Sequence, residues 1–220
     1  MQNTLRARAH FFLGFLKNNH DFDLVHSPKK ISHPPIIRRL MTSEIKRDLS
    51  VSIERANIIV LVIGIPLAVL MFWAFSFLHD AEKMQTTWNT FVFLFVILLG
   101  IIVHELIHGI GWVIFGKQPF SNIKFGILWS SLTPYAHLKV PIEVNAYRIG
   151  AFLPGLIVGI IPFILSVILG NGNLFWFGLL HTIAAGGDWI VLWMIRNLKP
   201  GTLVEDHPTR AGCFVIEEQL

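Results

Sequence analysis

The chain has 220 residues, of which 53% are hydrophobic and only 15% are charged. Its mean hydropathy of +0.59 is too high for an ordinary water-soluble domain, so we expect several membrane-spanning helices. A net charge of +4 without a recognition motif does not indicate nucleic acid, and the single cysteine, Cys213, excludes an internal disulfide framework.

The N-terminal region, residues 1–56, is rich in lysine and arginine. It lacks the uninterrupted apolar core and the small-residue cleavage site of a signal peptide. We therefore expect a basic cytoplasmic segment that is retained, with a short helix over residues 43–55.

Four segments have about the 20 apolar residues that a helix needs to cross a bilayer. They are residues 57–79, 90–115, 148–170 and 174–195. The last two are separated by a very short polar turn and should form a helical hairpin. We therefore predict an all-α membrane protein with a four-helix transmembrane domain over residues 57–195 and a C-terminal tail over residues 196–220.

Basic residues are unevenly distributed among the loops. They gather in the N-terminal region, between the second and third helices and after the fourth, whereas Lys83 alone lies between the first and second. Because lysine and arginine favour the cytoplasmic side, both termini and the central loop are predicted to be cytoplasmic.

The central loop contains two segments of alternating polarity, residues 123–129 and 135–140, which predict a short β-hairpin. Two interpretations are open. An edge strand of the hairpin could pair with an unwound substrate segment, or the hairpin could cover the helix ends at the membrane interface.

The second predicted helix contains His104-Glu105-Leu106-Ile107-His108. The i, i+4 spacing places both imidazoles on one helix face, where they can bind one zinc ion. Glu105 lies beside them and can take a proton from a zinc-bound water, then pass it to a leaving amine. A carboxylate inside an apolar helix is costly and is usually kept for a function.

A catalytic zinc bound by two histidines needs a third protein ligand, and Asp188 is the predicted one. It lies seven residues before the end of the fourth helix, at the expected depth of His108. Gly186 and Gly187 are expected to let the second and fourth helices approach closely. The alternative is an interfacial Asp188 paired with Arg196 or Lys199.

Other polar residues are weaker candidates. His181 is about 10 Å nearer the outer surface than Asp188, which favours helix packing or substrate contact. His137, Glu143, Asp206 and His207 lie in predicted cytoplasmic segments and should be solvated, although a docked tail could bring Asp206 and His207 near the metal. Cys213 has no partner at zinc-finger spacing, so we expect it to be neither a ligand nor reactive.

The motif HELIHG on a membrane helix, followed by a later helix with an aspartate after small residues, resembles the site-two class of intramembrane zinc metalloproteases. The order of HELIHG, the central loop, the helix with Ala151-Phe152-Leu153-Pro154-Gly155 and the Gly187-Asp188 helix is similar to a bacterial family of zincin peptidases. The resemblance covers residues 90–195. It implies a bacterial cell-membrane protein in which His104, His108 and Asp188 bind zinc and Glu105 is the base. The Gly-Gly-Asp-Trp context of Asp188 differs from that of site-two proteases.

We therefore expect hydrolysis of peptide bonds within or next to the membrane, with one Zn²⁺ per chain, zinc-bound water as nucleophile and Glu105 as general base. The expected partners are a membrane protein or peptide substrate and the lipid bilayer. The alternative is a non-catalytic metal-binding scaffold or a metal carrier. A carrier should have ligands at several depths, and a scaffold has no use for Glu105.

Overall fold

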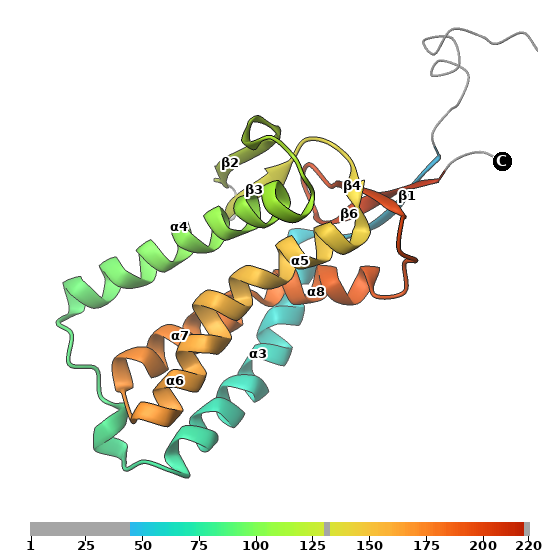
Figure 1. The fold of residues 1–220 in the computed structure, drawn as a ribbon. Coiled ribbons are helices and arrows are strands. Elements are labelled where there is room, and N and C mark those ends of the chain that lie inside the picture. Colours follow the sequence, from blue (N-terminus) through green and yellow to red (C-terminus); the bar gives the residue numbers. More distant parts are fainter. Residues whose placement is uncertain (1–44, 130–132, 218–220) are drawn as a thin grey trace, which may run out of the picture. The chain divides into compact units, whose positions relative to one another are not determined.

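The computed structural model describes residues 45–129 and 133–217, and most of this part is helical. Its longest elements are α3 (Ile53–Ser76), α4 (Thr90–Phe115) and a run made of α5 (Val144–Pro154), a π-helical segment (Gly155–Ile160) and α6 (Ile161–Leu169) (Figure 1). These three are long and apolar enough to cross a bilayer. Two 3₁₀ turns, Ala81–Met84 and Phe120–Asn122, follow α3 and α4.

The remaining helical pair is bent. Helices α7 (Gly172–Ala184) and α8 (Gly186–Ile195) meet at an angle of 43°, and together they have the length and apolarity of a fourth span. All four predicted helical segments are thus helical. The predicted fourth helix is not continuous, however, because the chain bends at Ala185, and α3 begins four residues earlier than predicted because Ser52 caps it.

A four-stranded antiparallel sheet corrects the all-α prediction. Its order is β1 (Ile45–Val51), β6 (Ala211–Glu217), β5 (Leu203–Asp206) and β4 (Ile142–Glu143). The prediction of a short helix over residues 43–55 is therefore wrong. Residues 45–51 lack strong local preference, and pairing with the β-branched and aromatic residues of β6 decides their conformation.

The predicted hairpin is confirmed. Strands β2 (Ile123–Leu128) and β3 (Thr133–Leu138) pair antiparallel, with Ile123 opposite Leu138. The hairpin lies at the C-terminal end of α4 (Figure 1). Among the described residues, β3 pairs with no strand other than β2.

One hydrophobic core joins the helices to both sheets. It contains buried residues of α4, α5, α8, the hairpin and the four-stranded sheet, among them Trp112, Leu138, Tyr147, Ile195, Val204 and Cys213. A second core lies around Phe75 and Phe175. By contrast, large apolar side chains of α3 and α4 are extensively exposed, including Leu61, Val62, Phe91 and Phe95.

Candidate metal centre

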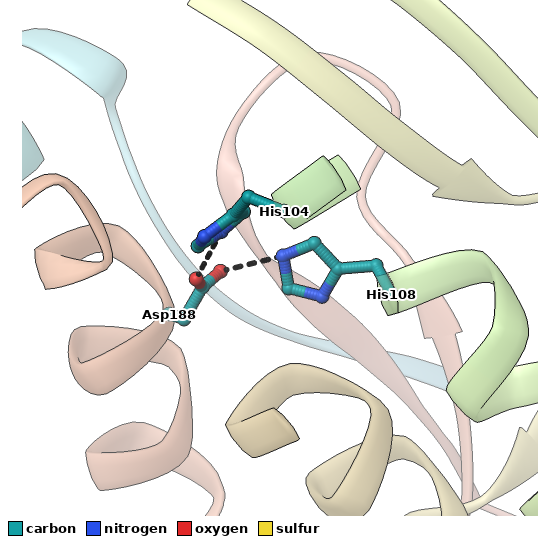
Figure 2. Close-up of side chains that lie close together, drawn as sticks. All are labelled: His104, His108 and Asp188. Atoms are coloured by element: carbon teal, nitrogen blue, oxygen red, sulfur yellow. Dashed lines mark hydrogen bonds and ion pairs between the residues drawn. The ribbon is translucent and has the colours of Figure 1, made fainter. Parts of the chain in front are cut away.

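Three ligand-type side chains converge between α4 and α8. Asp188 points its carboxylate between the imidazoles of His104 and His108 (Figure 2). One carboxylate oxygen, Oδ2, lies 3.0 Å from His104 Nε2, and Oδ1 lies 3.3 Å from His108 Nε2. One ligand atom from each residue lies within 4.8 Å of the other two, and both histidines are buried.

The bend between α7 and α8 places Asp188 in the first turn of α8. At the bend, Gly186 lies against α3, where an added Cβ would come within 2.6 Å of the Val60 side chain, whereas Gly187 faces open space. The prediction that these glycines bring the second and fourth predicted helices together is therefore wrong. Gly186 instead allows α3 to approach the bend closely.

The orientation of His108 is fixed by a main-chain carbonyl. His108 Nδ1 lies 2.9 Å from the Gly150 oxygen. Because a carbonyl can only accept, Nδ1 carries the proton, and Nε2 of the neutral ring presents its lone pair towards Asp188. The carbonyl is available because residue 154, four positions further along α5, is proline and has no N–H to donate to it.

A close helix contact brings that carbonyl within reach. A Cβ added to Gly111 of α4 would lie 2.9 Å from the Gly150 Cα, so the two backbones meet without intervening side chains. Next to this contact the Trp112 ring stacks on both His108 and Tyr147, with ring centroids 5.5 and 5.7 Å apart. The packing of α4 against α5 thus determines the position of His108.

These residues fit a zinc ion. His108 Nε2 and Asp188 Oδ1 face each other as two acceptors, and this arrangement is favourable only when a proton or a metal ion is shared between them. Two imidazole nitrogens and one carboxylate oxygen form a donor set that suits zinc and leaves a fourth position open. A carbonyl bonded to the other ring nitrogen is also typical of metal-binding histidines.

The three residues line a cavity of about 490 Å³, which Glu105 also lines. Its walls come from α3, α4, the hairpin, α5, the α7–α8 bend and the turn between β5 and β6. Glu105 is not one of the three clustered ligand residues. Its carboxylate is therefore left for another role next to the predicted metal.

The predicted alternative for Asp188, an ion pair with Arg196 or Lys199, is absent. Arg196 instead donates to the Trp193 carbonyl and stacks on the Trp193 ring. The salt bridges of Asp188 among the described residues are with the two histidines.

His181 lies outside the ligand cluster. It is buried where α7 crosses α4, and a Cβ added to Gly100 would lie 2.3 Å from its Nε2. Gly100 is one helical turn before His104, towards the start of α4. This position agrees with the expectation of a helix-packing histidine.

The C-terminal tail lies closer to the ligand cluster than the sequence predicts. The cavity that the ligand residues line is also lined by His137, Asp206 and His207. The prediction that these residues are solvated is wrong for Asp206, whose side chain is only 14% exposed. Asp206 accepts a hydrogen bond from Tyr147, a residue that the sequence did not suggest. Glu143, by contrast, caps the start of α5. The apolar run Phe214-Val215-Ile216 of β6 was the available signal, because β-branched and aromatic residues in a row predict a strand that packs against the domain.

Comparison with known families agrees with this geometry. Residues 97–203 match a family model described as "Putative zincin peptidase". The match contains both histidines, Glu105 and Asp188, and ends at the first residue of β5. No curated protein and no solved structure matches the chain. The match supports a zincin-like, zinc-dependent peptidase. Asp206 lies beyond the matched residues.

Proposed function

We propose that this protein is a membrane zinc metalloprotease that resembles the site-two class and cleaves peptide bonds within or next to the bilayer. The observation that carries the proposal is the convergence of His104, His108 and Asp188 within 4.8 Å, in a cavity that Glu105 also lines. The family match over residues 97–203 supports the same reaction class.

The membrane setting is supported by the helices themselves. Only 11% of the most apolar window of α4 is buried within the protein, although this helix contains the metal motif. Such a surface would be costly in water and is favourable in lipid. We place the protein in a bacterial cell membrane with several crossings and both termini in the cytoplasm, in agreement with the charge distribution of the loops.

His104, His108 and Asp188 would hold one Zn²⁺ per chain. Zinc, when bound, polarises a substrate carbonyl and lowers the pKa of a coordinated water. Glu105 is the general base: it accepts a proton from the attacking water and delivers it to the leaving amine. The Gly150 carbonyl keeps His108 in the tautomer whose Nε2 can bind the metal.

The hairpin offers a way to hold an extended peptide. Pro134, Ala136 and His137 of β3 line the cavity, and the second edge of β3 has no strand partner among the described residues. A substrate segment that pairs with this edge would gain main-chain hydrogen bonds beside Glu105. We therefore propose an unwound segment of a membrane protein, or a membrane-associated peptide, as the substrate.

The first experiment is a metal measurement. The protein is purified in detergent without a histidine tag, and its zinc content is compared with that of His108→Ala and Asp188→Ala. We expect about one zinc per chain in the wild type and loss of zinc in both variants. Freshly prepared wild-type protein without metal would contradict the proposal, and loss in His108→Ala alone would remove Asp188 from the site.

Glu105→Gln then separates an enzyme from a metal-binding scaffold. The amide cannot act as a base, so zinc content should be retained while cleavage of fluorescein-labelled β-casein falls by about 10²-fold or more. Glu205→Gln is the matched control, because Glu205 pairs with Lys46 on the four-stranded sheet. Equal cleavage by Glu105→Gln and wild type would favour the scaffold or a different base.

A further inference from the structure

A second carboxylate in the cavity, that of Asp206, bridges two elements that are separate in the sequence. Its Oδ1 accepts a hydrogen bond from the Tyr147 hydroxyl of α5 at 2.7 Å. Its Oδ2 lies 3.0 Å from His137 Nδ1 and accepts from the Leu138 N–H at 3.3 Å, both in β3. Strand β5 thus ties the hairpin to the helix that presents Gly150 to His108.

The Asp206 bonds reach the edge of β3 that faces away from β2. The Lys139 N–H donates to Asn122 on the β2 side. Because N–H groups alternate along a strand, those of Leu138 and Ala136 point to the other edge. The Leu138 N–H donates to Asp206, and the Ala136 N–H donates to the Glu105 carboxylate.

Few main-chain N–H groups remain on this edge of β3 to bind the carbonyls of a peptide. Proline at position 134 has no N–H, so among the described residues Ala136 carries the one N–H of this edge that Asp206 does not engage. A peptide that pairs with β3 therefore has one N–H, that of Ala136, at which its carbonyl can be bound, and there it competes with the Glu105 carboxylate. Any slip of β3 would move this N–H relative to the base.

The side chains of the Asp206 cluster are largely shielded from solvent. Tyr147 is 3% exposed, and the side chains of Asp206 and His137 are 14% and 22% exposed. Satisfying a carboxylate at this depth requires several donors, and three are supplied from two elements. Removing the carboxylate would leave buried donors without partners and would free β3 from α5.

We propose that Asp206 is a positioning residue that sets the register of a substrate peptide on β3. It acts through His137, Leu138 and Tyr147, and it does not touch the reacting atoms. The inference rests on the proposed peptidase function, and it identifies an extended peptide held at one register as the class of substrate.

The test compares Asp206→Ala, Asp206→Asn and Tyr147→Phe with wild type, and Glu205→Gln is the control. Glu205 is the neighbouring residue of β5, but it pairs with Lys46 away from the cavity. Three quantities are measured in detergent: zinc content, hydrogen exchange of the peptide covering residues 133–140, and the cut sites in β-casein determined by mass spectrometry.

In Asp206→Ala we expect exchange in β3 to rise by about tenfold while zinc content stays unchanged. The cut sites in casein should spread to neighbouring positions, because the bound peptide is no longer held at one register. Asp206→Asn and Tyr147→Phe keep part of the network and should show smaller changes in the same direction. Glu205→Gln should match the wild type in all three.

A purely structural role predicts a different outcome. Fewer folded molecules would cleave less casein, but at the same positions. Unchanged exchange in β3, or unchanged cut sites in variants that retain zinc, would overturn the proposal. If Asp206→Ala does not fold, Tyr147→Phe still decides, because it removes one hydroxyl only. If the wild type cleaves no casein, the peptidase proposal has failed, and exchange in β3 still tests the link between Asp206 and the hairpin.

Discussion

Two aspartates face the same cavity, and they differ in whether the groups around them donate hydrogen bonds. Asp206 is surrounded by groups that donate hydrogen to it, from Tyr147, His137 and the main chain of Leu138. Asp188 faces the Nε2 atoms of two histidines, and in His108 the proton is on the other nitrogen. Asp206 is therefore satisfied by the protein alone, whereas Asp188 and His108 need a cation.

This difference distinguishes a structural carboxylate from a candidate ligand when both are buried near histidine. Proximity of Asp and His is common to both regions, so it does not discriminate between them. The tautomer of the histidine does, because it shows which ring nitrogen is free to bind a metal.

The largest effect is expected from replacing each aspartate with the isosteric amide. Asp188→Asn removes a charged oxygen donor, and zinc affinity should fall on the order of 100-fold. Asp206→Asn should keep the affinity of the wild type. Competition with a chromophoric chelator in detergent measures both, and an equal loss in the two variants would erase the distinction between them.

A smaller effect is expected from Pro154→Ala. Alanine restores an N–H that can donate to the Gly150 carbonyl, where it competes with His108 Nδ1. Loss of such an orienting bond lowers metal affinity by about 10- to 100-fold, and we expect the lower end because the carbonyl can accept two bonds. Pro162→Ala is the matched control in the same helical run, since no ligand depends on the carbonyl four residues before it.

If Pro154→Ala and Pro162→Ala bind zinc equally, the freed carbonyl does not orient His108. The chelator competition used for the aspartate variants measures this difference as well. A gain of thermal stability in Pro154→Ala together with weaker zinc binding would be the clearest result, because it would show that the proline serves the site at the expense of the helix.

The smallest effect concerns Glu143, a carboxylate that main-chain donors satisfy. Partial burial opposes its ionisation, but the N–H groups of Gly201, Ala146 and Asn145 outweigh this and hold the pKa of the Glu143 carboxyl below its ordinary value. Glu143→Gln should lower the stability by about 1 kcal/mol at pH 7, as for loss of a helix cap.

The stabilisation by Glu143 is expected to decrease as the pH falls. A carboxyl with a lowered folded-state pKa contributes stability above its unfolded-state pKa, and this contribution is lost as the pH falls through the folded-state value. The difference in melting temperature between Glu143→Gln and wild type should therefore be full at pH 7 and shrink below about pH 4. A difference that grows in acid would contradict the capping role.

Helix α4 and its two candidate ligands could be predicted from the sequence, because they depend on residues that are close together in the chain. His104 and His108 are one helical turn apart, and Asp188 follows from comparing depths in two apolar segments. The hairpin was similarly local. The Asp206 cluster was not predictable in this way, because it depends on β5 pairing with β6, and β6 with β1, across the whole domain. The bend at Ala185 was also missed, because it lies where α3 packs against Gly186, a contact between segments far apart in the sequence.

The order of these residues along the chain has a consequence during synthesis. His104 and His108 leave the ribosome together, and Asp188 follows His104 by 84 residues. Strand β5, with Asp206, comes later still, and it must pair with β6 before the cavity has its last wall. A nascent chain with only the two histidines therefore lacks both the third ligand and the wall that holds the hairpin. Under the proposed function, the growing chain is not exposed to its own peptidase activity until its C-terminal strands have folded.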